Sequence, residues 1–125
     1  MDYNAYKLVH VVGLLLLFAS LGGLAVLGGL GTDPARSKPF KAVLNAFHGL
    51  GLVVLLVAGF GLLAKLDMSA PDKWGGWVYA KIVLWVVFGA AVVPLKRAPS
   101  LARLWLLVLV GLGCAAGWLA LMKPF

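Results

Sequence analysis

The sequence predicts an all-α integral membrane protein, folded as an antiparallel bundle of four transmembrane helices. Three features predict it: four nearly uncharged apolar runs, a composition that is 63% hydrophobic and 12% charged, and short connections between the runs. About 20 apolar residues, each rising ~1.5 Å, span the ~30 Å hydrocarbon layer of a bilayer. Backbone groups in that layer must bond within their own helix. We expect a single four-helix transmembrane domain over residues 1–125.

The expected helices cover about residues 6–30, 40–66, 74–96 and 100–122. Each run is apolar on all sides, whereas a soluble helix shows one polar face. The first helix ends before Thr32-Asp33-Pro34, and the second ends before Ser69-Ala70-Pro71-Asp72. The third ends before Ala98-Pro99-Ser100. Residues of these types form turns and helix starts. Because the connections are short, consecutive helices are predicted to be antiparallel neighbours.

The net charge of +7 does not indicate a nucleic acid partner, because the basic residues form no stripe and no aromatic platform accompanies them. The lipid bilayer is the expected partner. The first and third connections carry six basic residues: Arg36, Lys38, Lys41, Lys96, Arg97 and Arg103. Asp33 is the one acidic residue beside them. The positive-inside rule then places both termini outside, in a protein of the cell's inner membrane.

Small residues crowd the last run, which contains Gly113-x-x-x-Gly117 and the single cysteine, Cys114. In lipid, small residues let helices approach each other closely. Gly113 and Gly117 are therefore expected to lie against another helix, within the bundle, in a homo-oligomer or in a membrane partner protein. One cysteine excludes an internal disulfide and any C-x-x-C site.

The first two runs share a His-x-x-Gly motif near their beginnings, at His10-x-x-Gly13 and His48-x-x-Gly51. At the same offset of 38 residues, Leu17 pairs with Leu55 and Gly23 with Gly61. Ionisable side chains in hydrocarbon are functional candidates, and imidazole is a frequent metal ligand, so each histidine is a candidate ligand. Their depths in the bilayer differ by about 18 Å. We therefore expect separate sites, or one haem with a single histidine ligand, rather than a haem held by both.

Lys81 in the third run is predicted at the same end of the bundle as His10, because the first and third helices run in the same direction. A lysine there can pair with a propionate or another carboxylate. Gly13, one turn after His10, is expected to leave space for a flat ligand. Trp85, one turn after Lys81, is expected to cover the same pocket. The alternative for Lys81 is snorkelling, in which its ammonium reaches the headgroups beside an aromatic belt.

His48 follows Asn45 by three residues, so the two side chains share a helix face. On one interpretation they bind a ligand together, directly or through a water molecule. On the other, the imidazole forms a hydrogen bond with a backbone carbonyl of a neighbouring helix. The sequence leaves both interpretations open.

Two segments resemble one family. Tyr6-Lys-Leu-Val-His10, followed by Leu21-Gly22-Gly23-Leu24, resembles the first helix of the HemJ-type membrane protoporphyrinogen oxidases and their CopD-like relatives. Trp77-Val-Tyr79-Ala-Lys81 resembles their third helix. The resemblance implies a four-helix core, haem b as the cofactor, and functional roles for His10 and Lys81. This chain has Tyr79 where the family pattern has a histidine.

Three functions follow as hypotheses. The first is a membrane protein that binds haem b or a similar planar cofactor and acts as an oxidoreductase. The second is a non-catalytic membrane subunit or assembly factor, whose histidines serve packing. The third is a CopD-like metal-handling transporter, for which the chain offers few ligands: three Met, one Cys and no Glu. A visible spectrum separates the first two, because bound haem gives a Soret band.

Overall fold

The computed structural model describes residues 1–31 and 33–125; Thr32, part of the predicted first turn, lies outside the described residues. Within those ranges the chain is all-helical and contains no strand. The helices are α1 (Tyr3–Leu30), α2 (Pro34–Lys65), α3 (Gly76–Ala90), α4 (Val92–Arg97) and α5 (Ala102–Met122), with short 3-10 turns at Pro71–Lys73 and Pro99–Leu101. Four stretches are long and apolar enough to cross a membrane: α1, α2, α3 with α4, and α5 with the turn before it. The predicted helical class and the four apolar spans are confirmed.

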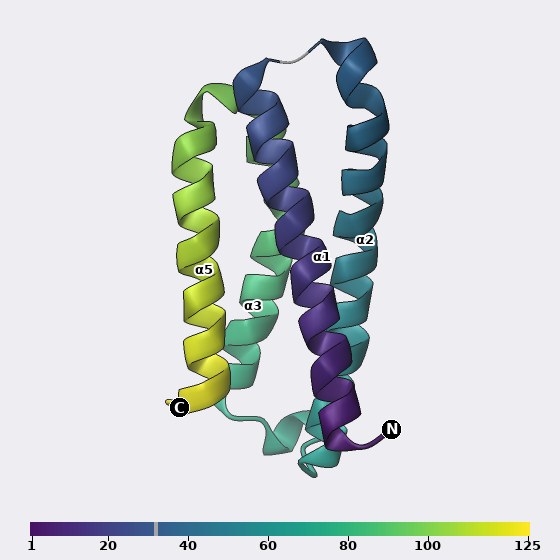
Figure 1. The fold of residues 1–125 in the computed structure, drawn as a ribbon. Coiled ribbons are helices and arrows are strands. Elements are labelled where there is room, and N and C mark those ends of the chain that lie inside the picture. Colours follow the sequence, from purple (N-terminus) through teal and green to yellow (C-terminus); the bar gives the residue numbers. More distant parts are fainter. Residues whose placement is uncertain (32) are drawn as a thin grey trace.

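The second helix begins at Pro34, earlier than the expected start near residue 40. Asp33 provides the cap, since its carboxylate accepts a hydrogen bond from Ala35 N at 3.2 Å. Proline is well placed at the first helical position, where its missing N–H is not needed. The basic residues predicted in the first connection, Arg36, Lys38 and Lys41, therefore lie in the first turns of α2. Figure 1 shows that α2 begins at the end of the molecule away from the termini.

The third span is not the single helix expected over 74–96. It begins at Gly76 and is interrupted at Ala91, where α3 gives way to α4. Pro94 accounts for the interruption, because it has no N–H to donate to the carbonyl four residues earlier. Ala91 N instead donates to Phe88 O at 3.3 Å, a tighter turn than the α-helical one.

Glycines bring α1 and α2 into close contact. A Cβ on Gly13 would lie 3.0 Å from the backbone N of Leu55, and one on Gly51 would lie 2.9 Å from the backbone N of Leu17. Leu17 and Leu55 are themselves partners in the 38-residue repeat. A second pair of contacts is related in the same way: Gly23 faces Leu44, and Gly61 faces Tyr6. Tyr6 and Leu44 are also 38 residues apart. The sequence repeat thus corresponds to a helix pair with an approximate two-fold relationship, packed through small residues.

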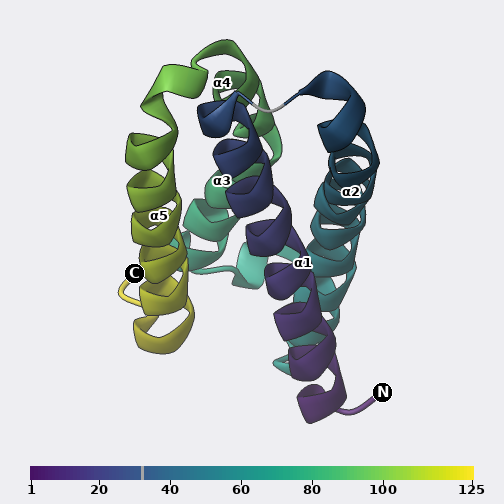
Figure 2. The ribbon, with the colours of Figure 1, turned by 45° about the horizontal axis from the view of Figure 1, so that its top comes forward.

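In both ribbon views α1 lies between α2 and α5, and the two termini lie at the end away from the α1–α2 connection (Figures 1 and 2). The core is centred on α1, through Leu17, Leu21 and Leu24, which pack with Phe88 and Leu95. Near its C-terminal end α1 contacts α4 and the turn before α5, whereas α3 packs only sparsely against α2.

Candidate functional site

A pocket of about 290 Å³ lies among α1, α2, α3 and α5, in the half of the molecule that holds the termini. Its walls are mainly leucine and aromatic side chains, and its inner end is formed by Leu17 and Phe88. Phe18 supports that end, because its ring packs edge-on against Phe88 at a centroid distance of 5.2 Å and lies against Gly113. The volume is at the lower end of the ~300–1,000 Å³ typical of small-molecule pockets.

The first helix, α1, contributes two residues with polar groups to the pocket, Tyr3 near its start and His10. The His10 ring lies beside Gly59 of α2, where Cε1 is 3.7 Å and Nδ1 is 3.9 Å from the position that a Cβ would take. Nδ1 is enclosed and has no hydrogen-bond partner among the described residues, although the Leu55 backbone lies near the imidazole. Buried polar atoms are nearly always paired, so an imidazole with one weakly satisfied nitrogen in an apolar pocket makes His10 a candidate ligand.

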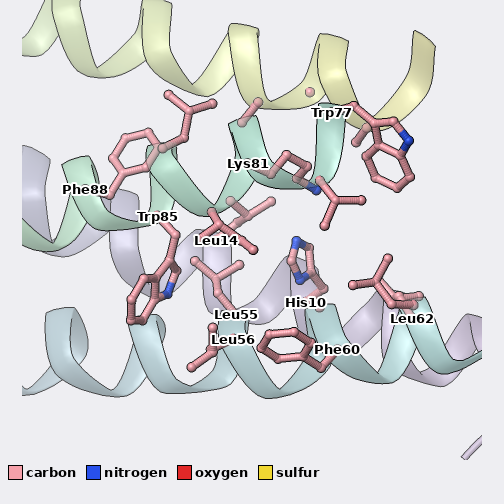
Figure 3. Close-up of a pocket in the computed structure, with 18 of the residues that line it drawn as sticks. His10, Leu14, Leu55, Leu56, Phe60, Leu62, Trp77, Lys81, Trp85 and Phe88 are labelled. Carbon is pink, nitrogen blue, oxygen red and sulfur yellow. The ribbon is translucent and has the colours of Figure 1, made fainter. Parts of the chain in front are cut away.

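Lys81 enters the same pocket from α3. Figure 3 shows its ammonium and the His10 imidazole pointing toward each other across the cavity. The side chain is half-buried. Among the described residues, the ionisable groups close enough to act on it electrostatically are His10 and Lys123, both of them bases. Among the described residues, no aspartate or glutamate side chain lines the pocket beside Lys81.

Trp85 forms another part of the pocket wall, as Figure 3 shows. Its indole N–H donates a hydrogen bond to the carbonyl oxygen of Leu52 at 3.0 Å. The ring thus lines the cavity while its polar edge connects α3 to α2. The structure brings His10, Lys81 and Trp85 together in one site.

Three other residues singled out by the sequence lie outside the pocket lining. Gly13 is buried against α2, so its missing side chain serves helix packing rather than ligand space. Asn45 is exposed, and its amide donates to Lys41 O at 2.8 Å within its own helix. His48 contacts the carbonyl oxygen of Phe88 through Nε2 at 3.2 Å. Of the two interpretations of His48, the contact with a backbone carbonyl is the one that the structure contains.

The two histidines lie far apart along the helix pair. His10 is beside Gly59, and His48 is eleven residues further along α2 from that position. At ~1.5 Å per residue, this separates them by about 16 Å along the axis. One iron ion cannot be ligated by both, and the separation is close to the one predicted from their depths.

Lys123 was not singled out from the sequence, yet it lines the same pocket. It follows the last residue of α5, and its ammonium lies 5.3 Å from the centre of the Trp77 ring. The sequence contains only a weak indication that Lys123 belongs to the site. It is a lysine that follows the last apolar run, at the membrane end where Trp77 is also expected. Of the two glycines expected to pack against a helix, Gly113 lies against Phe18, whereas Gly117 has no atom within 4 Å of its Cβ position.

Among the residues that the structure describes, His, Cys, Asp and Glu form no group of three or more that could hold a metal ion. A haem iron differs from such a centre, because the porphyrin itself supplies four ligands and the protein supplies one or two. Comparisons with family models, with curated proteins and with solved structures found no match for this chain.

Proposed function

We propose that this chain is a small integral membrane protein, an antiparallel four-helix bundle, that binds haem b or a similar planar cofactor in the pocket between His10 and Lys81. The observation that carries the proposal is that the His10 imidazole and the Lys81 ammonium face each other across an apolar pocket, as Figure 3 shows. The resemblance of the His10 and Lys81 segments to HemJ-type and CopD-like proteins supports the same cofactor.

The donor set fits a haem with one protein ligand. A neutral imidazole is a common axial ligand of haem iron, and His10 is the histidine in the pocket. The ammonium of Lys81 suits a propionate, and Trp85 offers a flat apolar face. Haem b, when bound, would supply one-electron redox chemistry at its iron. Because the pocket is small for a macrocycle, binding requires α3 to move outward from α2, and these two helices pack sparsely.

Membrane insertion is part of the proposal. Large apolar side chains are exposed on α1, α2, α3 and α5, among them Leu15, Val57, Val83 and Leu107. Exposed apolar surface of this extent is suited to lipid rather than water. Basic residues flank the connections at the end away from the termini, and from the positive-inside rule we infer that both termini lie outside, in a protein of the cell's inner membrane.

A visible spectrum of protein purified from cells with adequate haem tests the cofactor. We expect a Soret band that His10→Ala abolishes and that Lys81→Ala weakens or shifts. His48→Ala is the matched control, since it removes an imidazole outside the pocket and should leave the band in place. A full haem complement in His10→Ala would refute the assignment. Loss of all haem in both histidine variants would instead support a shared ligand pair.

A second candidate function is a non-catalytic membrane subunit or assembly factor. It is favoured by the contact of His48 with a backbone carbonyl and by the open space around Gly111 on α5, which lies outside the pocket lining where another helix can approach. Absence of a Soret band after haem supplementation, together with a stable larger complex in mild detergent, would favour this function over the first.

A further inference from the structure

Lys123 is held at the mouth of the pocket by the way α5 ends. Its backbone adopts a left-handed conformation with φ of 45°, and its N–H donates to Leu119 O at 3.1 Å. A non-glycine residue adopts this conformation rarely, because its Cβ crowds the following carbonyl. The turn directs the chain back toward α3, so that the ammonium lies over the Trp77 ring and the side chain lines the cavity.

The residues after Lys123 fasten this turn to the start of α3. Trp77 N donates to the backbone oxygen of Phe125 at 3.1 Å. This bond replaces a side-chain cap, because the residue before α3 is Gly75 and makes no such bond. The Phe125 ring also packs on Gly76, where a Cβ would collide with it. Lys123 is therefore positioned by three contacts with the beginning of α3 rather than free to extend into water.

Among the described residues, no aspartate or glutamate side chain lines this end of the pocket. Lys123 acts electrostatically on Lys81, which in turn acts on His10, and all three groups are bases. The acids on this side of the molecule, Asp2, Asp67 and Asp72, are exposed outside the pocket lining. Two ammonium groups beside an apolar wall attract an anion strongly, because the low dielectric there weakens screening.

The geometry points to an anion-binding role for Lys123: together with Lys81 it binds the carboxylate or phosphate of an amphipathic ligand whose apolar body fills the pocket. This inference rests on the pocket of the proposed function but not on iron ligation by His10. It adds a second cation, on α5, to the site, and it defines the ligand class as an amphiphile with an acidic end.

Metal-free protoporphyrin IX is a suitable probe, because it has two carboxylates and no iron for His10 to ligate. Its binding to protein in nanodiscs of neutral phosphatidylcholine is followed by quenching of tryptophan fluorescence. We expect its dimethyl ester to bind more than tenfold more weakly, because it loses the charge-assisted contacts with both Lys81 and Lys123. Lys123→Gln should weaken binding of the acid about tenfold, the effect of losing one charge-assisted contact, without changing binding of the ester. Lys123→Arg should retain most of the affinity for the acid.

Lys73→Gln is the matched control. It removes the same charge from an exposed lysine on the same side of the molecule that does not line the pocket. Equal binding of acid and ester, or equal losses in Lys73→Gln and Lys123→Gln, would overturn the inference. So would failure of both protoporphyrin and a fluorescent long-chain fatty acid to bind.

Nanodiscs that contain phosphatidylglycerol identify the source of the anion. Competition by this lipid that depends on Lys123 would assign the site to a phospholipid phosphate, whereas no competition would assign it to a carboxylate ligand. The inference and the proposed function can fail separately. A Soret band that survives His10→Ala refutes the haem assignment alone, and an acid-to-ester ratio near one refutes the anion site alone.

Discussion

His48 Nε2 lies 3.2 Å from the carbonyl oxygen of Phe88, and this contact joins the middle of α2 to the last turn of α3. The carbonyl is available because α3 ends two residues later, where Ala91 N makes only a long 3.3 Å bond to it. Together with the bond from Trp85 to Leu52, it connects two helices that otherwise pack sparsely. His48 therefore has a structural explanation that does not involve a cofactor.

We predict that His48→Ala lowers the free energy of unfolding by about 1 kcal/mol, the scale of interhelical hydrogen bonds in membranes. Denaturant titration in detergent micelles measures it. Asn45→Ala is the control, since that side chain is exposed and bonds within its own helix. Equal stability of His48→Ala and the unmodified protein would contradict the structural role of the imidazole.

A second prediction concerns the contact between α1 and α2. Gly51→Ala places a methyl group 2.9 Å from the Leu17 backbone, where the obstacle is main chain and cannot rotate away. We expect destabilisation of about 1–3 kcal/mol, the range for overpacked cores. The measurement is the melting temperature in detergent, followed by circular dichroism.

Gly49→Ala is a matched control for that substitution. Gly49 is in the same helix, two residues away, and has no atom within 4 Å of its Cβ position. The alanine should be neutral or slightly stabilising, because glycine in a helix interior is less favourable than alanine by up to ~1 kcal/mol. Similar melting temperatures for the two variants would contradict the close approach of the helices.

Composition and run length were sufficient to predict the helical class and the four apolar spans, because the cost of unpaired backbone in lipid leaves few other structures. The 38-residue repeat was also visible in the sequence, but only part of it corresponds to equivalent structural roles in α1 and α2. Its glycines have equivalent packing roles in both helices. Its histidines have different roles, because His10 lines the pocket whereas His48 contacts the last turn of α3. That difference depends on how α3 lies relative to α2, which the repeat does not encode.

The sequence predictions that differ from the structure concern the start of α2, the interruption of the third span and Lys123. The start of α2 was misjudged because charged residues were assigned to a loop, although the Asp33-Pro34 pair is a helix start. The interruption at Ala91 was signalled by Pro94 and was not predicted. Lys123 was missed for a different reason: the turn that returns it to the pocket is a left-handed residue without glycine, which no sequence pattern indicated.

The last prediction is the orientation in the membrane, tested with single cysteines in a Cys114→Ser background, since Cys114 is exposed. Ala35 and Ser100 are exposed at the end away from the termini, and Ser69 is exposed at the end that holds them. Substitution at these positions leaves all charged residues in place, and Ser37 is not used because it is 2% exposed.

In intact cells we expect a membrane-impermeant maleimide to label Ser69→Cys only. Ala35→Cys and Ser100→Cys should react after permeabilisation, because basic residues beside them hold that end in the cytoplasm. The reverse pattern would place the termini inside, and with them the mouth of the pocket and Lys123.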